Sequence, residues 1–341
     1  MRIPASSRHI LAAVAVLFLS MPAFSQAPAA EGSLRERLQE RRLAKTAAAQ
    51  PTSLSEATLS PGTHRIELQH GGIKRDYLLF IPASYRPGVP APLLFAFHGG
   101  MGNMNHFADN YGVTLAAETH GSIVVIPNGT GPSGSGRMGT WNAGLCCHWA
   151  RDNKIDDVGF VGTILSEVSS RLTVDRRRVY ATGMSNGAML AYRVACELSG
   201  SFTAIAAVAG TDNTGECRPT RPVSVLHIHA RDDERVLFDG GAGPANRDPS
   251  KVTDFASVSS TVSRWVSADR CQAQPRRVLS RDGAQCDLYA PCSSGAAVQL
   301  CVTEAGGHSW PGATSRRKTT STALDANQVM WDFFNALPSP R

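Results

Sequence analysis

The sequence predicts an α/β fold in which helices cover both faces of a mostly parallel central sheet. Apolar strand candidates alternate with helix candidates through most of the chain, and this alternation is typical of parallel sheets built from strand-helix-strand units. Several strand candidates are apolar at successive positions, as in strands that are buried on both faces. We expect a single domain over residues 63–337, because no second linker or charge shift divides this region.

The first 25 residues have the pattern of a secretory signal peptide. Arg2 and Arg8 precede an apolar stretch at residues 10–19, and small residues follow it up to Ser25. A positive start, a short apolar core and a small-residue cleavage site are the three parts of such a signal. The apolar core is shorter than the roughly 18 residues of a membrane span. We therefore expect cleavage after Ser25, no membrane span, and a protein secreted to the periplasm or the extracellular space.

The charge of the chain is mildly basic and does not indicate a nucleic-acid partner. The net charge is +6, and loss of Arg2 and Arg8 with the signal peptide leaves 32 basic against 28 acidic side chains, or +4. Much of this excess lies in residues 35–45, which hold no aromatic side chain that could stack on a base. We interpret residues 26–62 as a charged, alanine-rich tether and linker, and we expect a monomer that binds no nucleic acid.

Eight cysteines fit an oxidising compartment, because thiols there tend to pair and an even count leaves none over. Two pairs are expected, one between Cys286 and Cys301 across a predicted hairpin, the other between Cys196 and Cys217. The cysteine spacing does not supply the paired clusters of a zinc site, so we expect no metal and no organic cofactor. Four cysteines are left without an assigned partner: Cys146, Cys147, Cys271 and Cys292.

The predicted elements follow in a regular order after residue 62. Residues 65–68 and 75–81, joined through a Gly-Gly turn, predict an antiparallel pair at one edge of the sheet. Residues 93–97 are continuously apolar and end at the letters HGG. The later elements are a helix at 113–119, a strand at 123–126, a helix at 158–171, a strand and a helix on either side of residue 185, strands at 204–209 and 223–229, a helix at 258–267, strands near 288 and at 298–303, and a helix at 325–334.

A glycine-rich loop at residues 128–157 separates two of these elements. No Lys-Ser or Lys-Thr follows its glycines, which excludes a phosphate-binding loop. Because a structureless segment of this length is usually functional, we expect it to form a wall of the functional site. We expect Trp141 in this loop and Trp310 near the C-terminus to contact substrate through flat apolar faces, with core packing as the alternative. Asp157 is expected to cap the helix that begins near Val158.

Residues 183–187 read GMSNG between a strand candidate and an apolar, alanine-rich helix candidate. Glycines on both sides of Ser185 allow the strand and the helix to pack closely while the serine side chain points outward at the end of the strand. This context is that of a nucleophile elbow, and it predicts Ser185 as a nucleophile. The alternative is an ordinary turn with a serine that caps a helix.

A serine hydroxyl needs a base to take its proton, and the base needs an acid to orient it. On the α/β-hydrolase fold, the acid and then the histidine follow the serine in the chain, which leaves His227, His229 and His308 as candidates. His227 and His229 lie in an apolar strand candidate, where buried and hydrogen-bonded histidines are expected. His308 lies in a glycine-rich loop after the last predicted strand, so we predict His308 as the base.

Asp232 and Asp233 compete for the role of the acid, since both follow the same predicted strand. We favour Asp233, and a loop carboxylate paired with an arginine is the alternative for either residue. The oxyanion of a tetrahedral intermediate also needs preorganised N–H donors. We predict the backbone N–H groups of Asn186 and Gly100 for this role, with Met101 as the alternative to Gly100.

Five ordered motifs are FHGG at 97–100, WNAG at 141–144 with CC at 146–147, DDVGF at 156–160, GMSNGA at 183–188 and GHSWPG at 307–312. Together they resemble the secreted polyhydroxybutyrate depolymerase and feruloyl esterase family, also called LpqC-like esterases. The resemblance implies an α/β-hydrolase fold and an esterase with Ser185, Asp233 and His308 as its triad. The segment at 229–237 departs from the family pattern, because it lacks the usual glycine before the acid and the usual proline after it.

These observations predict a secreted carboxylic-ester hydrolase that works through an acyl-enzyme. The favoured substrates are hydroxyalkanoate esters or oligomers of the polyhydroxybutyrate type, and a feruloyl or acetylxylan ester of plant polysaccharide is the alternative. A serine peptidase would share the fold and the triad. An exported binding protein on a catalytically dead hydrolase scaffold is the remaining, non-enzymatic alternative.

Overall fold

The computed structural model describes residues 52–55, 59–246, 254–313 and 320–338. The predicted signal peptide at residues 1–25 and the predicted tether up to residue 51 lie outside the described residues. The segment Ala48–Arg341 groups into one compact unit. Within the described ranges, no helix combines the length and the apolar character needed to cross a bilayer.

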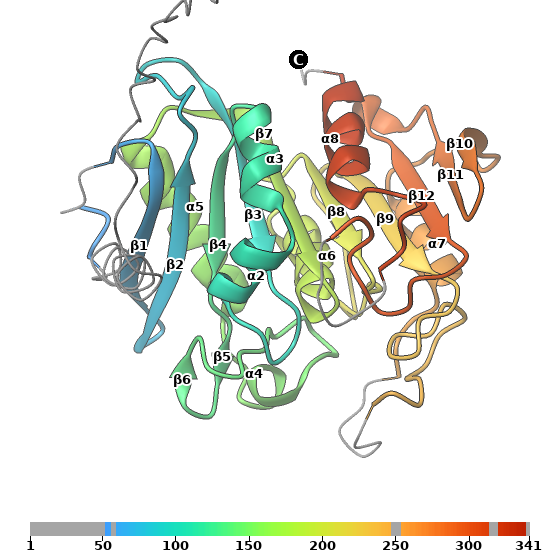
Figure 1. Ribbon diagram of the computed structural model, residues 1–341, viewed down its shortest axis with the longest axis horizontal. Coiled ribbons are helices and arrows are strands. Elements are labelled where there is room, and N and C mark those ends of the chain that lie inside the picture. The colour runs from blue at the N-terminus through green and yellow to red at the C-terminus, as the bar shows by residue number, and fades with distance from the viewer. Residues whose placement is uncertain (1–51, 56–58, 247–253, 314–319, 339–341) are drawn as a thin grey trace, which may run out of the picture. The chain divides into compact units, whose positions relative to one another are not determined.

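Ten strands pair in one mixed sheet at the centre of the described residues (Figure 1). They are β1 Gly62–His70, β2 Ile73–Ile81, β3 Ala91–Phe97, β4 Ile123–Pro127, β7 Val174–Met184, β8 Ala204–Val208, β9 Ser224–Ala230, β10 Arg276–Arg281, β11 Ala284–Tyr289 and β12 Val298–Thr303. Their order is β1-β2-β4-β3-β7-β8-β9-β12-β11-β10. The run from β4 to β12 is parallel, and two antiparallel strands close each edge. The predicted mostly parallel sheet is therefore confirmed.

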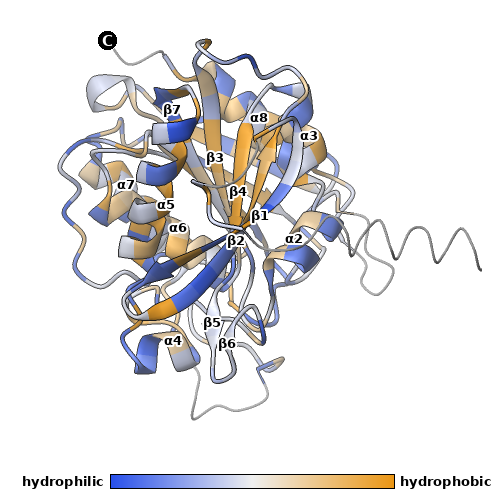
Figure 2. Ribbon diagram, turned by 90° about the vertical axis from the view of Figure 1, so that its left-hand side faces the viewer, coloured by the Kyte–Doolittle hydropathy of each residue, from blue (hydrophilic) through white to orange (hydrophobic). Residues whose placement is uncertain are grey.

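Helices cover both faces of this sheet, as the alternating pattern predicts (Figure 2). On one face lie α5 Asp157–Arg171, α6 Asn186–Glu197 and α7 Val258–Ala268. On the other lie α2 Met104–Asn110, α3 Val113–Thr119 and α8 Ala326–Ala336. Because both faces are covered, β3, β4 and β9 are buried at every position, which explains their continuously apolar sequences.

Each predicted helix and strand is present close to its expected bounds, and the missed elements are short or exposed. The strand β10 has an exposed, arginine-rich sequence without the apolar alternation that reveals a strand. The helix α2 spans only two turns and begins at the cap Asn103, whose side chain accepts the N–H of His106. Three further short elements lie in the glycine-rich loop: β5 Thr130–Gly131, β6 Gly134–Ser135 and α4 His148–Asp152.

The end of the predicted linker belongs to the folded unit. The Thr52 N–H donates to the Arg65 carbonyl at 3.3 Å, and the Glu67 N–H donates to the Thr52 carbonyl at 2.9 Å. The side chain of Leu54 is buried in the core. Thr52 and Leu54 therefore pack on the folded unit, and burial of Leu54 adds apolar surface to the core.

Four disulfides join all eight cysteines. Cys286 and Cys301 are paired and stand opposite one another on β11 and β12, as predicted. The predicted pair of Cys196 with Cys217 is also present. The sequence left two pairs unassigned, and the structure joins Cys271 to Cys292 and Cys146 to its neighbour Cys147.

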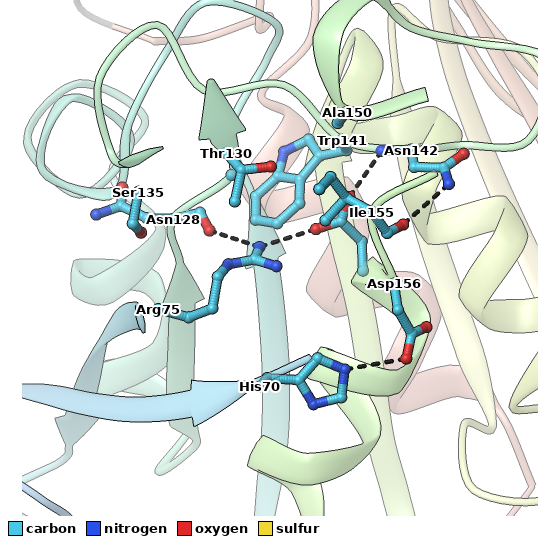
Figure 3. A network of polar contacts seen from close by, with 12 residues as sticks. His70, Arg75, Asn128, Thr130, Ser135, Trp141, Asn142, Ala150, Ile155 and Asp156 are labelled. Carbon is cyan, nitrogen blue, oxygen red and sulfur yellow. Dashed lines mark hydrogen bonds and ion pairs between the residues drawn. The ribbon is translucent and has the colours of Figure 1, made fainter. Parts of the chain in front are cut away.

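A buried arginine on β2, beside the edge strand β1, is bonded to both ends of the glycine-rich loop (Figure 3). Arg75 on β2 is 1% exposed and donates to the Asn128 carbonyl at 3.0 Å and to the Asp157 carboxylate at 2.8 Å. Its guanidinium lies 3.9 Å from the centre of the Phe160 ring. The second oxygen of Asp157 accepts the N–H of Asn142 at 2.7 Å. Charge and hydrogen bonds thus hold both ends of the loop, outside its short elements β5, β6 and α4.

The cap of α5 is Asp156, and not Asp157 as the sequence pattern predicts. The Asp156 carboxylate accepts the N–H of Gly159 at 2.9 Å. Asp157 is the first residue of the helix, is fully buried, and is bound instead by Arg75. Two adjacent carboxylates look alike in the sequence, and what separates them is an arginine 82 residues away in the chain.

Replacement of Arg75 with methionine should lower the free energy of unfolding by about 3–5 kcal/mol, because the Asp157 carboxylate then stays buried without its cation. Urea denaturation followed by circular dichroism measures this loss. The matched control is Arg277→Met, which removes an exposed ion pair with Asp287 and should cost less than about 1 kcal/mol. Equal losses in the two variants would contradict the role given to Arg75.

Candidate active site

Ser185 stands at a sharp turn between β7 and α6, where its backbone has φ 57° and ψ −123°. This left-handed conformation is strained for a residue with a side chain. Three glycines surround the turn and permit it. A Cβ atom at Gly187 would strike the Phe97 carbonyl, one at Gly210 the Ser185 carbonyl, and one at Gly183 the backbone of Gly187. The strain is therefore held in place by close backbone packing from neighbouring strands.

His308 lies between Ser185 and Asp233. Its Nε2 atom is 2.8 Å from Ser185 Oγ, and its Nδ1 atom is 2.8 Å from Asp233 Oδ2. The three residues follow β7, β9 and β12, which are parallel and so end at the same edge of the sheet. In this geometry the imidazole can take the serine proton while the carboxylate orients the ring.

Asp232 and Asp233 have different partners. Asp232 is exposed and accepts the N–H groups of Gly307 at 2.8 Å and Gly306 at 3.3 Å. Asp233 is 2% exposed, and it is this carboxylate that contacts the His308 ring. Asp232 therefore shapes the loop that carries His308, whereas Asp233 bonds to the imidazole itself.

Two buried histidines connect Asp233 to the core. The Tyr192 hydroxyl is 2.7 Å from His227 Nδ1, and His227 Nε2 is 3.1 Å from His229 Nδ1. His229 Nε2 in turn lies 2.8 Å from the Val236 carbonyl and 3.3 Å from Asp233 Oδ2. Because a carbonyl can only accept, His229 Nε2 carries a proton, and each earlier group in the chain donates to the next. Both histidines are buried in β9, as the sequence predicts, and they support the acid rather than contact Ser185.

Burial and hydrogen bonds set the charges of the site. Burial by itself raises the pKa of Asp233, but hydrogen bonds from His229 and His308 outweigh it and hold this pKa well below its usual range. Burial lowers the pKa of His308, against the opposing effect of the Asp233 carboxylate. At neutral pH the site therefore contains an ionised acid and an uncharged imidazole, which is the form that accepts a proton.

The predicted oxyanion donors lie beside the turn. A Cβ atom at Gly100 would lie 3.6 Å from the Cβ of Asn186, and Gly100, Met101 and Asn186 all line the cavity above Ser185. Among the described residues, none accepts a hydrogen bond from the backbone N–H of these three residues. Free N–H groups at this position are suited to a developing negative charge.

Trp141 supports the predicted oxyanion loop from inside the protein. Its ring is fully buried against Phe97 and His98. Its indole N–H donates to the His98 carbonyl at 2.8 Å, and its backbone N–H donates to Asn186 Oδ1 at 2.7 Å. Trp141 is not among the residues that line the cavity. The expectation that this ring contacts substrate is corrected, because the ring is fully buried and its indole N–H is bound to the His98 carbonyl.

His98 holds the same loop through its ring. Its Nε2 atom accepts the N–H of Gly129 at 2.8 Å, so Nδ1 carries the proton and donates to the Gly99 carbonyl at 2.8 Å. Burial lowers the pKa of His98 to about 4, which keeps the ring uncharged at neutral pH. Sequence order excludes His98 as the base, and the structure gives it a positioning role.

A cavity of about 550 Å³ opens above Ser185 and has mostly apolar walls. Trp310 lines it and is 1% exposed, packed edge-on against Phe107 and Tyr111. The glycine-rich loop contributes Cys147 and His148 to the lining, so it forms part of a wall, as expected. The larger apolar and aromatic lining residues are Met101, Tyr111, Met184, Met189, Val236, Phe255 and Trp310.

The Cys146–Cys147 disulfide belongs to one wall of this cavity. Both cysteines are buried in a small apolar cluster with Met189 and Val236, and Cys147 itself lines the cavity. The adjacent cysteines were the visible signal in the sequence, although their pairing with one another was not predicted. Among the described residues, no group of three or more His, Cys, Asp or Glu side chains is arranged to hold a metal ion.

Comparison with known proteins gives matches at both sequence and fold level. The family model described as Esterase PHB depolymerase matches residues 76–263. Feruloyl esterase B of Piromyces equi is 29% identical over 241 residues, which is 69% of this chain but only 42% of that protein. Feruloyl esterase C of Emericella nidulans is 32% identical over 196 residues, 55% of this chain and 67% of that protein. An acetyl xylan esterase from Aspergillus awamori shares the fold, with a TM-score of 0.52 at 14% identity over 76% of this chain and 94% of that chain.

The rate at which a fluorophosphonate labels Ser185 should fall as the pH drops through the pKa of His308, because a protonated imidazole cannot take the serine proton. Burial lowers this pKa from the ordinary value of 6.5, so the half-maximal rate should occur below pH 6.5. Intact-mass spectrometry between about pH 4 and pH 9 measures the rate. Ser185→Ala is the control and should take up no label. A half-maximal rate above pH 7 would contradict the assignment.

Asp233→Asn should reduce the labelling rate by about 10³–10⁴-fold, because an amide no longer holds the ring in the tautomer that accepts the serine proton. Asp232→Asn should cost far less, since Asp232 contacts only backbone N–H groups of the His308 loop. The same assay compares the two variants at one pH. Similar losses in both would show that the choice between the two acids is wrong.

Proposed function

This chain belongs to the Esterase PHB depolymerase family, and from that premise we propose that it hydrolyses carboxylic esters with Ser185 as its nucleophile. One observation carries the proposal: His308 Nε2 lies 2.8 Å from Ser185 Oγ at the floor of an apolar cavity, with Asp233 on the far side of the ring. Hydrogen-bond reach between nucleophile, base and orienting acid is the geometry that acyl transfer requires.

The proposed reaction has two halves. Ser185 Oγ attacks the ester carbonyl carbon while His308 Nε2 takes the hydroxyl proton, and the N–H groups of Asn186 and Gly100 bind the developing oxyanion. His308 then returns the proton to the leaving alcohol, and an acyl group remains on Ser185. Water gives a proton to His308 and attacks the acyl carbon, which releases a carboxylic acid and restores the serine. Asp233 stays ionised throughout and stabilises the imidazolium.

We propose hydroxyalkanoate esters or their oligomers as the substrates. The methionine and valine side chains of the lining provide aliphatic surface for a short acyl chain. The second candidate is a feruloyl or acetylxylan ester of plant polysaccharide. Tyr111, Phe255 and Trp310 also line the cavity and provide aromatic surface for a feruloyl group. The names of the related feruloyl and acetylxylan esterases support this second candidate.

We further propose that the protein is secreted and acts as a monomer in the periplasm or outside the cell. The pattern of the first 25 residues supports export. Four disulfides support an oxidising compartment, because reducing cytosols rarely keep such bonds. Residues 26–62 would then link the cleavage site to the folded unit.

Ser185→Ala should reduce hydrolysis of p-nitrophenyl butyrate by at least about 10³-fold, since the variant lacks the hydroxyl that carries the acyl intermediate. Release of p-nitrophenol measures the rate, and Ser170→Ala, at an exposed position on α5, serves as the matched control. Across hydroxybutyrate oligomers, methyl ferulate and acetylated xylan, we expect the highest kcat/KM on the oligomers. Full activity in Ser185→Ala would exclude the mechanism, and preference for methyl ferulate or acetylated xylan would select the second candidate.

A further inference from the structure

The cavity above Ser185 contains a cationic side chain that ester hydrolysis does not require. Arg235 is half-buried and lines the cavity together with His308, Asn246 and Phe255. Its backbone N–H donates to Asp233 Oδ1 at 2.8 Å, so the acid of the proposed triad fixes the position of this residue. This hydrogen bond therefore holds the backbone of Arg235 beside the reacting centre.

The guanidinium of Arg235 has no hydrogen-bond or ion-pair partner among the described residues, unlike several other arginines of the chain. Arg231, four positions earlier, lies 3.1 Å from a carboxylate oxygen of Glu304. Arg264 lies 3.3 Å from a carboxylate oxygen of Asp212. A planar guanidinium has five N–H donors and matches a carboxylate through two parallel hydrogen bonds. The N–H donors of the Arg235 guanidinium are thus available to bind a ligand.

Arg235 lies between the cavity and an adjoining hollow, and the acidic side chains around it, Asp232, Glu234 and Glu304, line only that hollow. None of the described residues that line the cavity is aspartate or glutamate. The charge of Arg235 also acts on the reacting centre, because it helps to lower the pKa of His308, although burial has the larger effect. A positively charged, partly desolvated wall beside an ester-binding cavity favours a substrate that brings its own negative charge.

We propose that Arg235 binds a carboxylate of the substrate, so that the preferred substrate is an ester with a free carboxylate a few bonds from the scissile bond. This inference rests on the proposed hydrolysis at Ser185 and names the substrate class for that site. A short hydroxyalkanoate oligomer carries such a carboxylate at its acid end. An esterified polysaccharide that contains uronic acid carries one on a neighbouring sugar, and a simple alkyl ester carries none.

The first experiment compares two dimers of 3-hydroxybutyrate, one with its free carboxylate and one with a neutral carboxamide in that place. Both contain the same internal ester, and p-nitrophenyl butyrate reports hydrolysis without any second group. Chromatography of the released hydroxy acid gives kcat/KM at about pH 8.5, where His308 is uncharged in every variant. We expect the wild-type protein to prefer the carboxylate dimer by at least about tenfold.

Arg235→Gln should abolish this preference while its kcat/KM on the carboxamide dimer and on p-nitrophenyl butyrate stays within about threefold of wild type. Arg235→Lys should retain part of the preference, because it keeps the charge but loses the two parallel hydrogen bonds. The matched control is Arg231→Gln, which removes an arginine of the same loop that does not line the cavity. This control should keep the full preference.

A second pair of substrates distinguishes the source of the carboxylate. Acetylated xylan fragments with and without uronic acid side groups replace the dimers, and an Arg235-dependent preference in this pair alone would assign the carboxylate to a sugar. Equal wild-type rates within both pairs would overturn the proposal, as would equal losses of Arg235→Gln on charged and neutral substrates. Absence of wild-type p-nitrophenyl butyrate hydrolysis would instead overturn the proposed function, so the two failures are distinguishable.

Discussion

Close backbone packing around Ser185 is the constraint on which the site depends. At Gly187 the helix α6 meets the carbonyls of Phe97 and His98 at a distance that admits no side chain, and Gly210 meets the Ser185 carbonyl in the same way. These contacts hold the serine in its strained conformation. They also bring the loop after β3 against the start of α6, so a single packing arrangement positions both the nucleophile and the predicted oxyanion donors.

Buried polar groups hold the glycine-rich loop, which forms part of one wall of the site. Arg75 and Asp157 close the glycine-rich loop at its two ends. Two hydrogen bonds to His98, from Gly129 near the start of this loop and from Trp141 at its middle, hold it against the loop that carries Gly100. Each buried polar group in this set is costly unless it is paired. The pairing therefore specifies one loop conformation, because any rearrangement would leave charges or N–H groups unsatisfied inside the protein.

The hydrogen bonds of the Asp233 carboxylate connect the buried histidines, the base His308 and the loop that lines the cavity. Its two oxygens bind His308 and His229 on one side and the N–H groups of Arg235 and Val236 on the other. This set of donors keeps the carboxylate ionised despite its burial. The same loop carries Arg235, which lines the cavity, so the residue that orients the base and the residue proposed to bind the substrate carboxylate lie in one loop.

The sequence by itself determined the fold class, the order of the elements and the GMSNG turn, because apolar periodicity and glycine positions are local properties of the chain. The predictions from the sequence were weakest for side chains whose neighbours are distant in the chain. Only the tertiary structure decided that Asp156 and not Asp157 caps α5, that Trp141 is buried, that Cys146 pairs with Cys147, and that Arg235 lines the cavity. The contacts that decide these cases, such as Arg75 with Asp157 and Trp141 with His98, join residues that are distant in the sequence and meet only in the folded protein.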